Sequence, residues 1–120
     1  MAARSPEDVD RLFGEYVNAG NLDALVGLYE PGAALAFVPG AAPLVGTAAI
    51  REGLAGFLAA KPRLEMHVVK VIRAGDDLAV LYNDWRQIAP EPLAGKALEV
   101  VRRQADGTWR FVVDDPFARS

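Results

Sequence analysis

Residues 98–116, LEVVRRQADGTWRFVVDDP, carry the clearest local signal for the fold of this chain. Two runs rich in β-branched and aromatic residues flank Asp106-Gly107, a pair that readily adopts the positive φ angles of a tight hairpin turn. A hairpin closed at this turn places Glu99 directly opposite Asp114. Two ionised carboxylates at that separation repel each other. The pair therefore predicts either a proton shared within a site or a partner cation.

The composition is typical of one globular domain. The 120 residues are 52% hydrophobic and 24% charged, with a formal net charge of -3, a balance that disfavours nucleic acid as a partner. The chain has no cysteine and one histidine, so we expect neither a metal nor another cofactor. No apolar run has the length of a signal-peptide core or a membrane span. We therefore expect a single cytoplasmic domain over residues 1–120, without a membrane partner.

Local signals predict three helices before most of the strands. The predicted N-caps of the helices are Ser5, Asn21 and Thr47, and the stop signals of the first two are Asn18-Ala19-Gly20 and Pro31-Gly32. A short apolar strand, AALAFV at 33–38, precedes the third helix. Two β-rich runs around Gly75-Asp76 follow, and the 98–116 hairpin completes the chain. This order predicts an α+β fold.

The two hairpins predict a sheet with two different faces. With Ala74 opposite Asp77, one face is mixed and the other strongly apolar. The mixed face combines Glu65, His67, Tyr82, Asp84, Arg86, Glu99 and Asp114 with Val69, Val71, Val80, Val101 and Val112. The apolar face holds Leu64, Met66, Val68, Ile72, Leu81, Trp85, Leu98, Val100, Trp109, Phe111 and Val113. Burial of a large apolar side chain gains about 1.5–3 kcal/mol, so hydrophobicity alone favours helices on the apolar face.

Three segments follow patterns that recur together in one group of proteins. Residues 18–29 read N-x-G-[DN]-x-D-x-[LIV]-x-x-L-[YF], residues 46–51 read G-x-x-[AG]-I-R, and residues 102–109 read R-R-x-x-D-G-x-W. With the order of elements, these segments resemble the nuclear transport factor 2-like superfamily, particularly its ketosteroid isomerase-like and SnoaL-like members. The resemblance covers nearly the whole chain.

The resemblance implies a cystatin-like cone, in which three N-terminal helices pack against a curved, mostly antiparallel sheet around a pocket. It also implies a homodimer through the outer sheet face, so that the mixed face lines the pocket and Trp85 and Trp109 meet a second subunit. The implied ligand is a small apolar or polyketide- or steroid-like molecule. Its expected contacts are Phe13, Tyr16, Phe37, Phe57, Tyr82, Arg86, Val101 and Val112.

The resemblance also implies candidate catalytic residues. Ketosteroid isomerases use a tyrosine and an aspartate where this chain has Phe13 and Phe37, so authentic ketosteroid isomerisation is not expected. Glu99 matches the buried acid of their oxyanion hole and can stay protonated in an apolar cavity.

Other members of the superfamily imply further candidates. Asp114 or His67 would move a proton in a SnoaL-like cyclase. Limonene-epoxide hydrolase-like members place an arginine between two aspartates, for which Asp84, Arg86 and Asp114 are the candidates here, with the first aspartate and the arginine in the opposite order.

The residues themselves leave plainer interpretations open. Glu99 and Asp114 could share a proton, or bind Arg86, for architecture only, and His67 could be a surface residue. Asp84 and Arg86 could form ion pairs on the sheet. The function is then an enzyme of isomerase, cyclase or hydratase type, or a non-catalytic binding or association module. Epoxide hydrolase-like activity is a further alternative.

Overall fold

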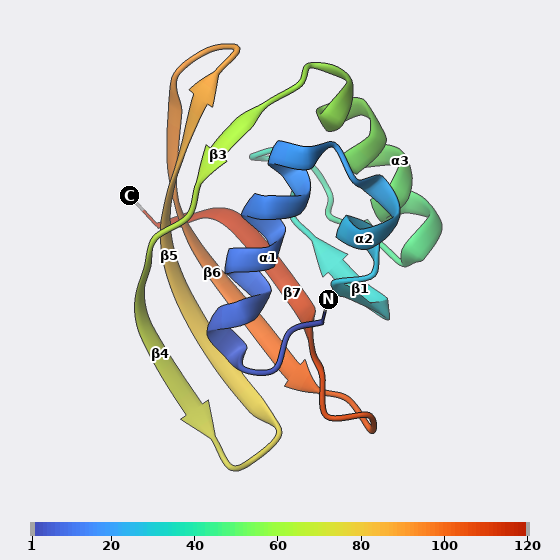
Figure 1. Ribbon diagram of the computed structural model, residues 1–120, viewed down its shortest axis with the longest axis vertical. Coiled ribbons are helices and arrows are strands. Elements are labelled where there is room, and N and C mark those ends of the chain that lie inside the picture. The colour runs from blue at the N-terminus through green and yellow to red at the C-terminus, as the bar shows by residue number, and fades with distance from the viewer. Residues whose placement is uncertain (1, 120) are drawn as a thin grey trace.

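The computed structural model describes residues 2–119 and shows an α+β fold in which three helices pack on a curved sheet (Figure 1). The helices are α1 (Pro6–Ala19), α2 (Leu22–Val26) and α3 (Thr47–Ala59). The strands are β1 (Tyr29–Leu35), β2 (Leu44–Val45), β3 (Arg63–Glu65), β4 (Val68–Ala74), β5 (Leu78–Ala89), β6 (Leu93–Arg103) and β7 (Trp109–Arg119). The expected fold, a cystatin-like cone, is confirmed.

The helix α1 begins and ends where its capping residues predict. The Ser5 side chain accepts a hydrogen bond from the Asp8 backbone N–H, and Pro6 occupies the first turn. Gly20 ends the helix with a φ of 67°, a left-handed conformation that glycine adopts without a Cβ clash. The helix then lies across the concave side of the sheet (Figure 1). The cap of α3 differs from the prediction, because the N-cap residue is Gly46 and Thr47 is already helical.

The last strand of the chain lies in the middle of the sheet. The strand order is β2-β1-β7-β6-β5-β3, and β4 also pairs with β5. All pairings are antiparallel except that of β1 with β7, which is parallel. The strand β7 therefore connects the N-terminal part of the sheet to the long β5–β6 pair.

The strand β1 begins earlier than predicted. Tyr29 was expected at the end of the second helix, but that helix ends at Val26 and Tyr29 pairs with Phe111 of β7. The Phe111 backbone N–H donates to the Leu28 carbonyl over 2.7 Å. These long-range ladder bonds satisfy backbone groups that a short helix would leave to water, and they overrule the local helical spacing.

The hairpin registers are partly as predicted. Glu99 does lie opposite Asp114, and Glu65 does lie opposite Arg86. Two irregularities shift the remaining pairs. Ala74 pairs with Leu78 rather than Asp77, and the ladder shifts again between Val68 and Lys70.

A further irregularity lies in β7, where Val101 pairs with Phe111 instead of Val112. The extra residue turns Phe111 and Asp114 to the same side of the strand, since a bulge reverses the alternation of side chains. Both residues are consequently buried.

The prediction of which side chains of the two hairpins share a face of the sheet is wrong. Leu81 pairs with Glu99 and Asn83 with Ala97, and all four side chains are buried on the concave side. Tyr82, Asp84 and Arg86 therefore lie on the opposite, outer face, because neighbouring strand residues alternate between faces. A turn influences the pairing only within its own hairpin. It does not determine which side chains of the two hairpins share a face of the sheet.

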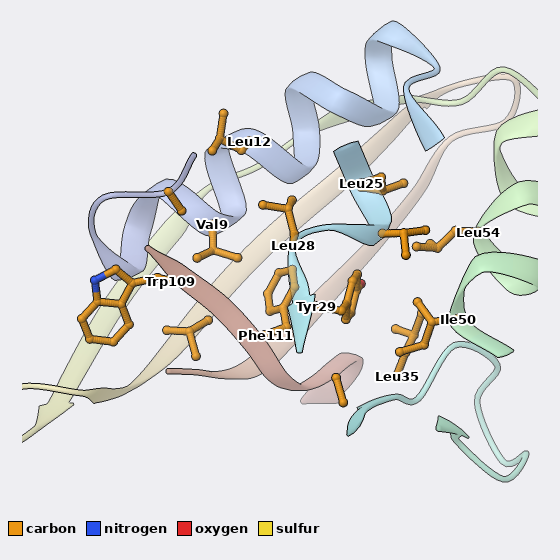
Figure 2. Packing of buried hydrophobic residues seen from close by; sticks show 14 of the residues in the cluster. Val9, Leu12, Leu25, Leu28, Tyr29, Leu35, Ile50, Leu54, Trp109 and Phe111 are labelled. Atoms are coloured by element: carbon orange, nitrogen blue, oxygen red, sulfur yellow. The ribbon is translucent and has the colours of Figure 1, made fainter. Parts of the chain in front are cut away.

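The core lies between the helices and the concave face of the sheet. Figure 2 shows it extending from Trp109 at one end, past Phe111 and Tyr29, to Leu54 at the other end. Trp109 is 4% exposed and Phe111 is fully buried. The expectation that Trp109 meets a second subunit is therefore wrong, because Trp109 belongs to the core, against which Trp85 also packs. No helix within residues 2–119 is long and apolar enough to span a bilayer.

Candidate functional site

A pocket of about 360 Å³ opens between the helices and the concave face of the sheet. Its walls are mostly apolar. Phe13 comes from α1, Phe57 from α3, and Phe37 from the segment that follows β1, with the Phe37 and Phe57 rings in edge-to-face contact. Across from them lies Trp85 of β5, whose indole N–H donates to the Pro116 carbonyl over 2.8 Å.

Two carboxyls reach this apolar pocket from neighbouring strands. Glu99 and Asp114 both line it, and each is only 3% exposed. The Tyr29 hydroxyl donates to Asp114 Oδ2 over 2.7 Å, which fixes the orientation of that carboxyl. Behind them lies Asp10 of α1, which is 0% exposed and outside the pocket wall. The site therefore concentrates three acids in a low-dielectric interior.

The surroundings raise the pKa of each of these acids. Burial raises the pKa of Asp114 to about 7, opposed by the hydrogen bond from Tyr29. Burial likewise raises the pKa of Asp10 to about 6. Burial first, and then the negative charges of Asp10 and Asp114, raise the pKa of Glu99 well above its usual range. The raised pKa of Glu99 thus favours its neutral form, while Asp114 exchanges its proton readily near pH 7.

This arrangement can both donate and accept a proton in one pocket. A protonated Glu99 can donate a hydrogen bond to a ligand oxygen, and Asp114 has the pKa of an efficient general base near neutral pH. No ion pair among residues 2–119 involves Asp10, Glu99 or Asp114. The expected Arg86 partner is instead paired with Glu65. A proton bound to one of these carboxyls therefore relieves the electrostatic repulsion between them.

The structure places the other predicted catalytic residues on the opposite side of the sheet. His67, Asp84 and Arg86 line a broad outer groove that also contains Arg119. Asp84 Oδ1 accepts from Arg119 Nη2 over 3.1 Å. His67 and Asp84 are backbone neighbours, since the Asp84 N–H donates to the His67 carbonyl. The set Asp84, Arg86 and Asp114 is therefore not brought together, because the hairpin phase separates Asp114 from the other two.

The remaining predicted ligand contacts also lie outside the pocket wall. Tyr82 lies on the outer face, where the guanidinium carbon of Arg119 is 5.0 Å from its ring centroid. Tyr16 packs half-buried against the core, Val101 is fully buried within it, and Val112 is the bulged residue of β7. Phe13, Phe37 and Phe57 are thus the predicted contacts that line the pocket.

Sequence reasoning missed three polar residues of the site: Asp10, Tyr29 and Asn83. Asp10 had a signal, because it is three residues before Phe13 and seven before Val17, on the buried side of an amphipathic helix. Tyr29 was assigned to the second helix, so its position on a strand of the site was not predicted. Asn83 is fully buried beside Glu99, and its Oδ1 accepts from the His67 backbone N–H over 2.9 Å.

Among residues 2–119, no group of three or more histidine, cysteine, aspartate or glutamate side chains is arranged to hold a metal ion.

Comparisons with solved structures agree with this architecture. A protein from Thiobacillus denitrificans, provisionally described as a calcium/calmodulin-dependent protein kinase type II association domain, is 31% identical with a TM-score of 0.80, over 98% of both chains. A provisionally described scytalone dehydratase from Novosphingobium aromaticivorans is 16% identical with a TM-score of 0.81, over 93% of this chain and 80% of that one. A ketosteroid isomerase-like protein from Erwinia carotovora atroseptica is 15% identical with a TM-score of 0.73, over 91% and 89%.

The last two similarities, at low identity, support the fold alone. No curated protein matches the sequence closely enough to count as a relative. The sequence profile of the SnoaL-like domain matches residues 9–117, which include most of α1 and both pocket carboxyls. On that match, the chain belongs to the SnoaL-like domain family.

Proposed function

We propose that this protein binds a small, largely apolar molecule in the pocket and moves a proton on it. The observation that carries the proposal is the placement of Glu99 and Asp114, two nearly fully buried carboxyls, in an otherwise apolar pocket without a cation. Burying such groups is costly for stability, and perturbed acids cluster at functional sites. The enclosed volume of about 360 Å³ suits a ligand of two or three rings.

The proposed chemistry is general acid–base catalysis next to a carbonyl. The Asp114 carboxylate accepts a proton from the carbon adjacent to the ligand carbonyl, whose C–H electrons form the enolate. Glu99 donates a hydrogen bond to the oxygen on which negative charge develops. Asp114 then gives its proton to another carbon of the enolate system, which isomerises the ligand, or first exchanges that proton with solvent and then reprotonates the same carbon, which exchanges the hydrogen. Phe13 and Phe37 supply neither group, so the reaction depends on the strand carboxyls.

Deuterium exchange tests this proposal without knowledge of the natural substrate. A two-ring ketone such as 2-tetralone is incubated in D₂O, and loss of its α-proton signal is followed by NMR. We expect exchange above the buffer rate with the wild type, and a loss of roughly 10²–10⁴-fold in Asp114→Asn. Asp84→Asn, on the outer face, is the matched control and keeps the rate. Exchange at the buffer rate for ketones that bind would refute catalysis and leave a binding protein.

We propose as a second function that the outer sheet face associates two copies of the chain. The 31% identical structure is described as an association domain, and the outer face exposes apolar side chains. Ile72 is 44% exposed and Val113 is 38% exposed, next to the half-buried Val80 and Val100. An exposed apolar face of this kind favours a protein partner.

Sedimentation equilibrium at micromolar concentration tests the association. We expect a homodimer for the wild type and a monomer for Val113→Glu, because a charge at the centre of the interface would be desolvated. Ala55→Glu is the control, since Ala55 is exposed on α3, on the other side of the sheet from this face. A monomeric wild type would refute this second function.

A further inference from the structure

Asp10 is a buried acid that the pocket itself does not explain. Its side chain is 0% exposed, and neither carboxyl oxygen has a hydrogen-bond donor among the described residues. It is absent from the pocket wall, so a ligand in the pocket would not contact it. Buried polar groups are almost always hydrogen-bonded, and an orphaned one lowers stability. A functional role for Asp10 would explain why this destabilising arrangement is present.

The neighbour that can satisfy Asp10 is Glu99. Glu99 Oε1 is likewise buried without a hydrogen-bond partner among the described residues, and the two carboxyls are close enough to shift each other's pKa. Glu99 also affects the pKa of Asp114. Two carboxyls form a hydrogen bond only when one of them carries a proton. Glu99 therefore lies between two acceptors, one behind it on α1 and one at the pocket.

Buried polar groups around this set come from four strands of the sheet. Tyr29 of β1, Asn83 of β5, Glu99 of β6 and Asp114 of β7 are all buried there. Tyr29 donates to Asp114 and stays neutral, because burial and the Asp114 charge raise its pKa well above 10. The other acids of α1, among them Glu15, lie at the surface. Among residues 2–119, no lysine or arginine forms an ion pair with Asp10.

We propose that Asp10 is a positioning residue that keeps Glu99 protonated by accepting its proton in a hydrogen bond, so that Asp114 remains free to take a proton from the ligand. The inference rests on the proposed function of the pocket. Without Asp10, the acceptor for the Glu99 proton would be Asp114 itself, which would lose basicity. With Asp10 ionised, its negative charge also opposes ionisation of Glu99.

The test is a pH titration of the carboxyl carbons of Glu99 and Asp114 by ¹³C NMR, in the wild type, Asp10→Asn and Glu15→Gln. Asparagine keeps the shape of the side chain and removes the charge. We expect Glu99 to titrate at least about one pH unit lower in Asp10→Asn, because a buried like charge has been removed. Glu15→Gln removes a charge from the exposed side of the same helix and is the control that leaves both curves unchanged.

A Glu99 curve that is the same in Asp10→Asn and in the wild type would overturn the inference. If Asp10→Asn fails to fold, the Asp10 carboxyl carbon is followed in Glu99→Gln instead. Coupled groups titrate in shared steps, so Asp10 is expected to change from two steps to one, and an unchanged Asp10 curve would equally overturn the proposal. These readouts are independent of catalysis: absence of deuterium exchange in the wild type refutes the proposed function, whereas the titrations decide the role of Asp10.

Discussion

At the scale of single residues, the hydrogen bond from Tyr29 to Asp114 has the most direct consequence for the site. It joins residues 85 positions apart over 2.7 Å and opposes the rise in the pKa of Asp114 that burial causes. A neutral hydrogen bond contributes about 1 kcal/mol to stability. The Tyr29 hydroxyl thus both stabilises the fold and keeps Asp114 ionisable near neutral pH.

Tyr29→Phe should therefore move the titration of Asp114 to higher pH, by about half a pH unit to one unit. The free energy of unfolding should fall by roughly 1–2 kcal/mol. Carboxyl ¹³C NMR and urea unfolding measure the two effects. Tyr82→Phe removes a hydroxyl from the outer face and should change neither quantity. A downward shift of the Asp114 titration would contradict the assigned direction of this hydrogen bond.

At the scale of elements, Gly95 shows how β6 and β5 fit around Trp85. A Cβ placed on Gly95 would overlap the Trp85 indole ring, which lines the pocket and bonds to the Pro116 carbonyl. Trp85 also meets Phe117 of β7 edge to face, with ring centroids 5.2 Å apart. The indole of Trp85 on β5 is therefore held by contacts with β6 and β7. Gly95 leaves space for the ring because glycine has no side chain.

Gly95→Ala should displace the indole and destabilise the protein by roughly 1–3 kcal/mol, as overpacking does. The Trp85 indole N–H should then lose protection against hydrogen exchange, which NMR detects. Gly56→Ala, in the exposed interior of α3 with nothing near the added carbon, should instead stabilise by about 0.5–1 kcal/mol. Equal stabilities for the two variants would show that the strands adjust around the indole without cost.

The elements also show what the sequence could and could not predict. The Ser5 cap, the Gly20 stop and the Asp106-Gly107 turn act over a few residues, so α1 and the last hairpin were predicted well. The Glu99–Asp114 pairing was also predicted, but it depends on the bulge at Val112 as well as on the turn, since the ladder next to the turn pairs Val101 with Phe111. The bulge at Val112 and the phase between β5 and β6 depend on packing against α1, which no local pattern encodes. That is why Asp84 and Arg86 were assigned to the wrong face, and why Tyr29 was assigned to a helix.

At the scale of the whole molecule, the three buried acids make stability depend on pH. Asp10, with a pKa of about 6, and Asp114, with a pKa of about 7, hold protons in the folded state that the unfolded chain releases near pH 4. Burial also raises the pKa of Glu99 well above its usual range, so Glu99 adds to this effect. The folded state therefore binds more protons, and the free energy of unfolding falls as pH rises through this range.

Urea unfolding at several values between pH 5 and pH 8 should show this loss of stability. Each excess proton contributes a slope of about 1.4 kcal/mol per pH unit. Asp10→Asn should flatten the curve and be more stable than the wild type at pH 8, because an uncompensated buried charge has been removed. Glu15→Gln should run parallel to the wild type. A stability that rises from pH 5 to pH 8 would contradict raised pKa values in the folded state.

The central place of β7 in the sheet has a consequence for protein synthesis. The strand is made after β1 and β6 but lies between them, and it carries Asp114. A nascent chain that still has β7 inside the ribosome can form helices and the β5–β6 hairpin, yet its sheet remains in two halves with Leu81 and Val101 uncovered. We expect the ligand pocket to come into existence only when this strand emerges, and chaperones to find their binding sites on the chain until then.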